Sequence, residues 1–386
     1  MPLADREFAY ASKLQSGGER SSSEAPAYSG SGFVRSATPL YEPLPRRRFI
    51  ALYLAIAAGR RVASLFPRLP SQPRSLPPWN PGVSLIVPEC NTPSLLRCAL
   101  KSATASLEQL GEEFELIVVV NGASPHTYAP HRREFPQVRW LFSKKHLGFG
   151  GAVGLGIRRA RFDWVYLLNS DMTLAADALR EVARCRAQHV FAIASQVFFA
   201  DLQRRREETG WTGFRIDESG MASLFDVTPQ DDFSIRGHLY AGGGNSLFRT
   251  ALLREFLDPL HPYNPVYWED AEWGLRAWRS GFEVLFCPAS LVTHLHRATV
   301  SRLFTPAEVD RIWKRNQLLF SLRNGFLHRS ARSVIRDLRH GFEAATQREV
   351  TTLRQAISMF RAICSLARAP KRNLDLGQVS RKYYER

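Results

Sequence analysis

The chain has 386 residues, of which 45% are hydrophobic and 23% charged, and it carries a net charge of +16. This length and composition are ordinary for a globular protein and exclude a chain too small to bury a core. The charge is concentrated at the two ends, because residues 1–75 hold 11 Lys/Arg against 5 Asp/Glu and residues 301–386 hold 18 against 7. We therefore expect terminal segments that either meet an anionic surface, acidic lipid or nucleic acid, or form basic faces with no partner.

The first 81 residues divide into three segments by composition. Residues 1–45 are polar and rich in Ser, Gly, Ala and Pro, which predicts a disordered tail rather than a signal peptide. Residues 46–66 contain an apolar stretch flanked by arginines, and this stretch is too short to span a bilayer. We therefore expect a helix that lies on a membrane surface or packs on the main domain. Residues 67–81 contain six prolines and predict a stiff linker.

The segment from residue 82 to 300 is predicted to be the main domain. Apolar runs alternate with helical patterns there, which predicts a mostly parallel α/β sheet flanked by helices. The expected strands are 83–87, 114–120, 138–142, 164–168, 190–195, 283–287 and 291–294, and the expected helices are 95–107, 150–161, 175–186, a short one from 250, and 271–280. Residues 201–236 are predicted to be irregular, and residues 301–386 a basic helical extension.

The spacing of the cysteines indicates the redox compartment of the protein. The five of them, at positions 90, 98, 185, 287 and 364, have neither zinc-binding spacing nor the pattern of a disulfide framework. This distribution favours a reducing compartment, and a cytoplasmic location is expected.

The run from Trp164 to Leu168 leads directly into Asn169, Ser170 and Asp171. Five continuous apolar residues predict a strand buried on both faces, and ligands of open α/β sheets sit at the carboxyl ends of such strands. Asp171 could hold a divalent cation against a phosphate, since Mg²⁺ takes one or two carboxylates plus phosphate oxygens. The alternative is that Asp171 only caps the following helix.

The adjacent pair Glu269 and Asp270 directly precedes a predicted helix. A helix N-terminus keeps carboxylates ionised, so one of the two could act as a general base toward a hydroxyl; the alternative is that they only cap the helix. The glycines at 148, 150, 151, 154 and 156 do not match a dinucleotide-binding fingerprint, because the third glycine of that pattern is missing. They are better explained as permitting close approach of a helix start to a ligand or to the sheet.

Seven motifs in order resemble the inverting family-2 glycosyltransferases, which have the GT-A fold. They are VPxxN at 87–91, VVxN at 118–121, GFGGAxxxGI at 148–157, LLNxD at 167–171, GGGNSLF at 242–248, WEDxExxLRxxRxG at 268–281, and His294. The likeness covers about residues 82–325 and includes an Arg-Asn pair at 315–316. Within the family, the chain looks most similar to rhamnosyl- and galactofuranosyltransferases of bacterial surface polysaccharide synthesis.

The resemblance implies a role for each matching residue. Asp270, with Glu269 as the other candidate, would be the catalytic base, and Asp171 with His294 would hold Mn²⁺ or Mg²⁺. The donor would be a UDP- or dTDP-linked sugar. It would bind residues at the ends of the predicted strands and at the start of the glycine-rich helix: Pro88, Asn91, Asn121, Gly148, Gly150, Gly151, Asn169, Ser170 and Asp171. Gly243, Gly244 and Trp268 would border the acceptor, a glycan or glycolipid.

Three positions depart from the family pattern. Val120 stands where an Asp often binds the nucleotide base, Asn169 replaces the first Asp of Asp-x-Asp, and Gly154 stands where Asn is common. The resemblance nevertheless implies a peripheral enzyme at the inner face of a membrane, with no nucleic-acid partner. Two other hypotheses compete with it. One is a nucleotidyltransferase, which would need a basic Gly-rich loop after the first strand, and the other is a basic nucleic-acid-binding protein.

Overall fold

The computed structural model describes residues 76–200, 212–218, 220–226, 234–258, 261–295, 299–324 and 326. Residues 1–75 lie outside the described part of the chain. They include the predicted tail, the apolar segment at 46–66 with its flanking arginines, and most of the linker. The basic extension beyond residue 326 lies outside the described part as well. Within the described part of the chain, every helix is too short or too polar to cross a membrane.

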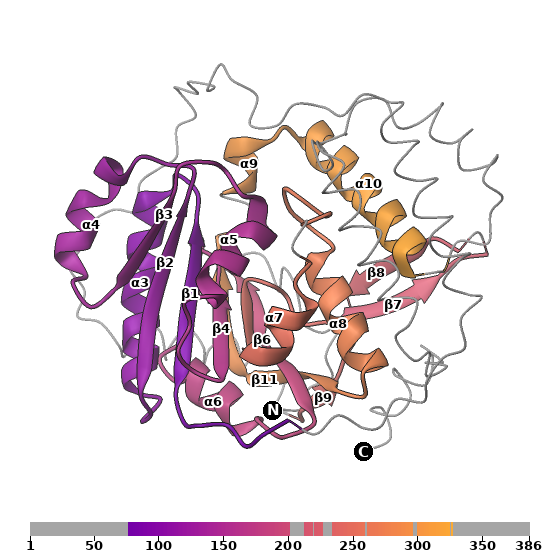
Figure 1. Cartoon of the computed structure of the whole chain (residues 1–386), viewed down its shortest axis with the longest axis horizontal. Coiled ribbons are helices and arrows are strands. Elements are labelled where there is room, and N and C mark those ends of the chain that lie inside the picture. The colour runs from indigo at the N-terminus through magenta and orange to yellow at the C-terminus, as the bar shows by residue number, and fades with distance from the viewer. Residues whose placement is uncertain are drawn as a thin grey trace.

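The centre of the molecule is one twisted sheet (Figure 1). Its strand order is β3-β2-β1-β4-β10-β6-β11-β5, with β9 paired to β11, and β7 and β8 form a separate hairpin. The strands are β1 (Val83–Glu89), β2 (Phe114–Asn121), β3 (Arg139–Ser143), β4 (Trp164–Leu168), β5 (Met172–Leu174), β6 (Val190–Phe199), β7 (Thr212–Ile216), β8 (Ala222–Asp226), β9 (Arg236–Gly237), β10 (Asn245–Arg249) and β11 (Glu283–His294).

Helices cover both faces of this sheet. They are α3 (Pro93–Glu108), η1 (Pro125–Tyr128), α4 (Ala129–Glu134), α5 (Gly148–Ile157), α6 (Ala178–Arg184), α7 (Thr250–Phe256), α8 (Glu269–Arg279), α9 (Val300–Leu303) and α10 (Pro306–Asn324). One core joins the sheet to α3 and α6, and a second joins its other face to α5, α7 and α8. The result is a three-layer α/β arrangement with the sheet in the middle.

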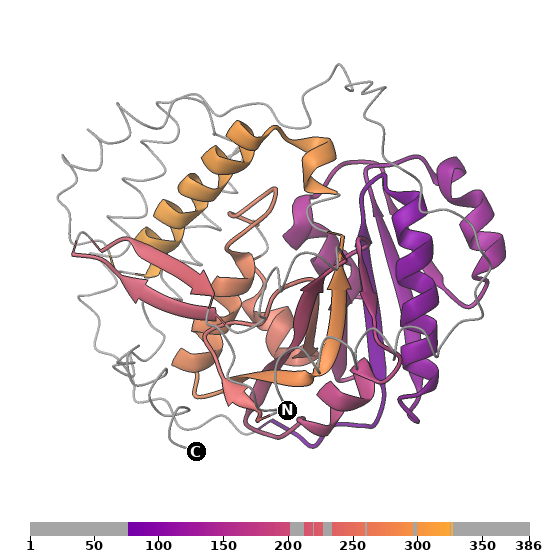
Figure 2. The same ribbon diagram turned by 180° about the vertical axis from the view of Figure 1, so that it is seen from behind.

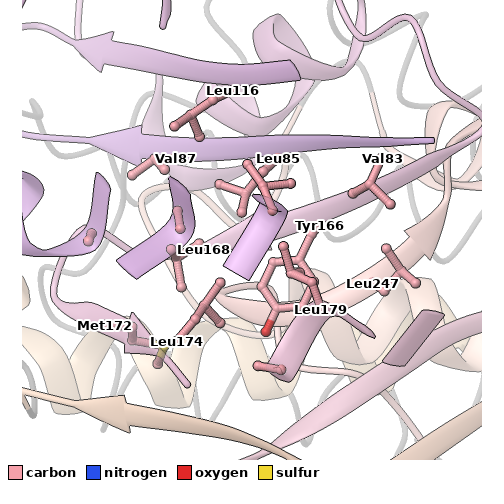
Figure 3. Packing of buried hydrophobic residues seen from close by; sticks show 14 of the residues in the cluster. Val83, Leu85, Val87, Leu116, Tyr166, Leu168, Met172, Leu174, Leu179 and Leu247 are labelled. Atoms are coloured by element: carbon pink, nitrogen blue, oxygen red, sulfur yellow. The ribbon is translucent and has the colours of Figure 1, made fainter. Parts of the chain in front are cut away.

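The continuous apolar runs of the sequence are explained by these two cores. In β1, Leu85 and Val87 point into the α3–α6 core while Ile86 points into the other one. Figure 3 shows Leu85 and Val87 packed with Tyr166 and Leu168 of β4 in the first core. Since successive side chains of a strand point to opposite faces, a strand covered on both sides needs an apolar residue at every position.

The predicted α/β fold is confirmed, and the sheet is less parallel than expected beyond β4. The strands β3, β2, β1 and β4 are all parallel, but β10 runs antiparallel to both β4 and β6, and β5 runs antiparallel to β11. Neither β5 nor β10 was expected, because three residues are too short for a visible period and β10 follows three glycines. The predicted strands 283–287 and 291–294 form one strand, β11, with an irregularity between Cys287 and Leu291.

Two other elements differ from the sequence analysis. The segment predicted to be irregular contains β7, β8 and β9. The helix α10 lies beside the β7–β8 hairpin, as Figures 1 and 2 both show, and its Leu319 and Phe320 pack in a third core with Trp268 and Leu275. This helix therefore supports α8 and the loop before it, although it follows the boundary proposed at residue 300.

Candidate active site

The candidate site lies at the edge where β1, β2 and β4 end. The register pairs Glu89 of β1 with Val120 of β2, so the predicted polar positions that follow both strands come together. Asn245 pairs with Leu168, so the glycine-rich turn before β10 also reaches the end of β4. His294 pairs with Met172, which brings the end of β11 next to Asp171.

Asp171 and His294 form a buried pair at this edge. Asp171 Oδ1 lies 3.5 Å from His294 Nε2, and the two residues are only 6% and 8% exposed. The backbone N–H of Thr299 donates to Asp171 Oδ2 at 3.2 Å. Burial by itself would raise the pKa of Asp171, but the hydrogen bond and charge of His294 and the Thr299 amide outweigh it, so the pKa is lowered. Asp171 is thus held as a carboxylate next to an imidazole.

The chemistry of this pair fits a divalent cation that also has phosphate ligands. No set of three His, Cys, Asp or Glu side chains among the described residues is arranged to hold a metal ion on its own. One carboxylate oxygen and one imidazole nitrogen are nevertheless suitable ligands, and adjacent ligands of an octahedral Mg²⁺ lie about 3 Å apart. The Asp171–His294 separation is close to that value. A diphosphate would then have to supply further oxygens.

Asn169 and Ser170 contact the protein rather than open space. The backbone N–H of Asn169 donates to Gly244 O at 2.9 Å, and a Cβ on Gly244 would lie 2.2 Å from Asn169 Nδ2. A side chain at 244 would therefore displace the Asn169 amide group. Ser170 is 2% exposed, and its hydroxyl hydrogen-bonds that of Thr92 at 3.1 Å. In this structure both residues fix the turn that presents Asp171.

A buried glutamate that the sequence analysis did not single out organises the end of β1. Glu89 is fully buried; its carboxylate accepts hydrogen bonds from Thr92 Oγ1 at 2.7 Å and Tyr128 Oη at 2.8 Å, and also from the Thr92 amide. Tyr128 Oη in turn accepts from the Asn91 amide at 3.2 Å. The exposed Asn91 adopts a left-handed φ of 55° within this loop, which follows the half-buried Pro88. A strand that ends in Pro-Glu gives no sequence signal of this role.

The glycine-rich start of α5 approaches another loop of the chain. A Cβ on Gly148 would lie 2.1 Å from Asn264 Oδ1, and one on Gly150 or Gly151 would meet His261. Asn121 fixes the same helix start, because its Oδ1 accepts from the Leu147 amide at 2.7 Å and its Nδ2 donates to Gly148 O at 3.1 Å. The contact of these residues with a nucleotide stays a prediction, while the close approach of the three glycines to Asn264 and His261 is a property of the fold.

Asp270 lies in the first turn of α8, half-buried. Its Oδ2 accepts from the Gly243 amide at 3.2 Å, and its Oδ1 from the Ala271 amide at 2.9 Å. Burial raises the pKa of Asp270 to about 6, although the Gly243 and Ala271 amides oppose that rise. At neutral pH the group is therefore ionised, with a basicity well above that of an exposed aspartate, which suits a general base.

Glu269 has a different environment. It is 9% exposed, its Oε2 has no hydrogen-bond partner, and it lines a pocket with His261 and Asn264. Burial, and then the charge of Asp270, raise the pKa of Glu269 well above its usual value. A raised pKa favours the protonated form, and a protonated carboxyl group cannot accept the proton of an acceptor hydroxyl. Of the two candidate bases, the environment favours Asp270.

Trp268 is not placed to meet an acceptor. It is 1% exposed and packs against Trp313 and Phe320, with ring centroids 5.4 and 5.0 Å away. The interpretation of Trp268 as an acceptor-binding residue is therefore not supported, and its side chain instead anchors the loop before α8. A sequence pattern cannot distinguish a tryptophan that faces a cleft from one that faces a core.

The glycine turn at 242–244 joins the two acidic centres. Gly243 donates its amide to Asp270, and Gly244 accepts from the amide of Asn169, two residues before Asp171. Phe149 lies on the other side of Gly243, where a Cβ would be 2.8 Å from its ring. The structure thus brings to one edge the strand end at 169–171, His294, the glycine turn and Asp270, which are far apart in sequence.

Comparison with known proteins identifies a domain family. The model of a family described as "Glycosyltransferase like family 2" matches residues 81–308, more than half of the chain. No curated protein matches the chain in sequence.

Solved structures resemble the chain only distantly. GalNAc-T7 with UDP, GalNAc and Mn²⁺ has 15% identity and a TM-score of 0.46, over 84% of this chain and 71% of that one. The mannosyltransferase PcManGT of Pyrobaculum calidifontis, in complex with GDP-Man and Mn²⁺, has 16% identity and a TM-score of 0.45, over 83% of each chain. S. aureus TarS 1-349 has 15% identity and a TM-score of 0.42, over 75% of this chain and 82% of that one. Likeness at this level says nothing about what this chain binds.

Proposed function

The chain belongs to glycosyltransferase-like family 2, and from this premise we propose that it moves a sugar, with inversion, from a nucleoside diphosphate to an acceptor hydroxyl with Asp270 as the base. As a member of the family it is a glycosyltransferase that uses nucleotide sugars, and its α/β fold is of the GT-A type. The observation that carries the inverting mechanism is the half-buried Asp270 carboxylate, with a pKa raised to about 6, joined through Gly243 and Gly244 to the Asp171 edge.

The reaction is a single displacement. The Asp270 carboxylate accepts the proton of the acceptor hydroxyl while that oxygen forms a bond to the anomeric carbon. The bond between this carbon and the diphosphate oxygen breaks, and the nucleoside diphosphate leaves with its electron pair. Because attack and departure occur on opposite faces, the anomeric configuration inverts. Gly243, whose amide binds Asp270, orients the carboxylate for this step.

Asp171 and His294 would hold the divalent cation, Mn²⁺ or Mg²⁺, beside the diphosphate. Bound there, the cation would supply electrostatic neutralisation of the leaving group. The support is the buried pair itself, in which Asp171 stays ionised beside an imidazole nitrogen 3.5 Å away. Asn169 contributes no charge, so the site has one carboxylate fewer than an Asp-x-Asp arrangement.

The donor is proposed to be a UDP- or dTDP-linked sugar, with rhamnose or galactofuranose as the first candidates. The support is the resemblance of the ordered motifs to transferases of that type. Val120 is fully buried and cannot bond a nucleotide base, so the base would have to be recognised by other groups. The acceptor is proposed to be a glycan or glycolipid of a surface polysaccharide.

The basic ends of the chain support a peripheral position at the inner face of a membrane. Residues 46–66 and the arginines after residue 301 would bind anionic headgroups, since clustered Lys and Arg near a lipid surface are each attracted to it. Flotation of the full chain with vesicles tests this. Recovery that is equal with neutral and anionic lipid, and unaffected by high salt, would contradict electrostatic binding.

The function is tested with a panel of nucleotide sugars in the presence of Mn²⁺. We expect one donor to raise the melting temperature and to release its nucleoside diphosphate when a hydroxyl acceptor is added, with inverted configuration in the product. The same protein incubated with nucleoside triphosphates and sugar 1-phosphates distinguishes a nucleotidyltransferase, which would release pyrophosphate instead. Retention of configuration would contradict Asp270 as the base of a single displacement.

A further inference from the structure

We propose that Asn316 of α10 is a positioning residue for the transfer reaction: its amide holds the loop 263–268 in the conformation that aims Asp270 at the acceptor. The proposal rests on the proposed function, because it assigns a role to a residue that acts through the catalytic base. Asn316 is fully buried and lies on a helix outside the sheet. It lies 46 residues after Asp270 in the sequence.

The contacts of Asn316 converge on this loop. Its Nδ2 donates to three backbone carbonyl oxygens, those of Tyr263 and Val266 at 2.8 Å and that of Tyr267 at 2.9 Å. A side-chain amide has only two hydrogens, so three carbonyls share them. These carbonyls belong to neither a helix nor a strand, and an amide at this position satisfies all three in the protein interior.

The amide is itself held in one orientation. Asn316 Oδ1 accepts from Arg315 Nε at 2.9 Å and from Arg315 Nη2 at 2.6 Å. Arg315, which is 1% exposed, also donates to the carbonyl of Asn264 in the same loop. Because the oxygen is occupied by the guanidinium, the NH₂ group must face the loop carbonyls. Arg315 and Asn316 therefore act together and bind the backbone carbonyls of the segment 263–267.

The loop needs such support because of its backbone conformation. Tyr267 and Trp268 both have φ of 77°, in the left-handed region that residues with a side chain rarely adopt. They directly precede Glu269, the first residue of α8, so their conformation sets the direction in which the helix starts. Strained residues of this kind persist where surrounding contacts fix them, and they cluster at functional sites.

The direction of α8 decides where the carboxylate of Asp270 points. Asp270 is the second residue of the helix, and its Oδ2 reaches the amide of Gly243 in the turn beside Asn169. The same loop also receives the Phe149 amide at Pro265 O, 2.7 Å away, from the start of α5. Relaxation of the loop would therefore shift Asp270 relative to the donor side of the site. A displacement of about 1 Å in such a group costs about 10²-fold in rate.

The experiment compares Asn316→Leu with the wild-type full chain. Leucine keeps the branched skeleton of asparagine, although its methyl groups are larger, and removes the hydrogen bonds to the three carbonyls. We expect hydrogen exchange of the amides in 264–270 to become faster, and turnover to fall about 10²-fold with the dissociation constant of the nucleoside diphosphate unchanged. In an Asp270→Asn background, Asn316→Leu should cause no further loss, because residues that act as a unit are not additive.

Gln317→Leu is the matched control. Gln317 is the next residue of α10, and its Nε2 donates to the carbonyl of Ala222 on β8 at 2.7 Å. The substitution removes a side-chain hydrogen bond from the same helix to a backbone carbonyl outside the loop. Turnover and exchange of 264–270 should remain those of the wild type. If Asn316→Leu fails to fold, Asn316→Asp keeps the shape and the contact with Arg315 and removes the donor group.

The outcomes separate the proposal from the proposed function. Unchanged exchange of the loop in Asn316→Leu, or a loss of turnover that persists undiminished in the Asp270→Asn background, would overturn the positioning role. If the wild-type chain turned over no nucleotide sugar, the proposed function would fail, and with it the catalytic meaning of the loop. Faster exchange confined to 264–270 would then still establish the contact between Asn316 and the loop.

Discussion

Two acidic residues, Asp171 and Asp270, lie at the same edge of the sheet, and their pKa values shift in opposite directions although burial raises both. Around Asp171, the imidazole of His294 and the Thr299 amide outweigh burial and lower the pKa of the carboxyl group. Around Asp270, amides alone oppose burial, and the pKa rises to about 6. The ionised form of Asp171 is thereby favoured, while Asp270 titrates closer to neutrality.

The comparison shows that position in the fold does not assign a chemical role. Both residues lie near the carboxyl edge of the sheet. The glycine turn at 242–244 contacts Asp270 directly and Asn169, two residues before Asp171. The difference comes from the partner: a group that can carry positive charge faces Asp171, whereas backbone dipoles face Asp270. A carboxylate suited to a metal and one suited to a proton can therefore lie at the same edge of a sheet when their partners differ.

The largest effect is expected from Asp270→Asn. The substitution removes the proton acceptor and leaves the shape and the Asp171 region intact, so turnover should fall about 10²- to 10⁴-fold while nucleoside diphosphate binding is retained. Steady-state kinetics with equilibrium binding would measure both. Glu269→Gln is the matched comparison, and a larger loss of turnover there than in Asp270→Asn would assign the base to Glu269.

Asp171→Asn should act on the other region. Removing the charge while keeping the shape should weaken metal-dependent donor binding by about 10- to 100-fold. Titration of the donor with and without EDTA would show this. In the wild type, chelation should weaken donor binding, and in Asp171→Asn it should make little difference. Equal sensitivity of the two proteins to chelation would place the cation elsewhere.

The pH dependence should report the ionisation of Asp270. A base must be ionised, so kcat/KM should fall about tenfold per pH unit below the pKa of about 6 and be level above it. Asp171, whose pKa is lowered, stays ionised throughout this window and adds no limb there. A pH–rate profile between pH 5 and 8 would measure the midpoint. An acid limb that survives in Asp270→Asn would contradict this assignment.

The smallest effect concerns stability. The pKa of Asp270 is higher in the folded chain than its usual value near 4, so the folded state loses stability as the pH rises from about 4 to 6. Asp270→Asn should therefore be more stable than the wild type at pH 8, by about 1–2 kcal/mol after allowance for partial exposure. Urea unfolding at pH 8 and pH 5 would measure this, with a smaller difference expected at pH 5.

Much of the first half of the domain, from β1 to β4, could be predicted from the sequence. The apolar runs of β1, β2 and β4 are continuous because both faces of each strand are covered, and this pattern is visible without any tertiary information. The polar residues after each run, including Asp171, could be assigned to one edge because parallel strands end together. The acidic start of α8 was visible for the same reason, as a local pattern.

The other half depended on contacts between distant residues. Strand β5 is short and β10 follows three glycines, so no hydrophobic period in the sequence indicates either strand. The family resemblance puts Trp268 at the acceptor, yet its side chain is buried against Trp313 and Phe320. Cys185 and Cys287 are 102 positions apart, and their thiols are hydrogen-bonded in the fold.

The sequence by itself determined the α/β class, the strands that end at the site and the acidic residues available there, because hydrophobic period and strand-end chemistry are local. Only the tertiary structure decided which carboxyl group has a lowered pKa and which a raised one. Those shifts depend on partners that are distant in sequence, such as Thr299, which is 128 residues from Asp171, and Gly243 beside Asp270. The pKa of a carboxyl group is set by the groups within a few ångströms of it, and the folded chain determines which groups those are.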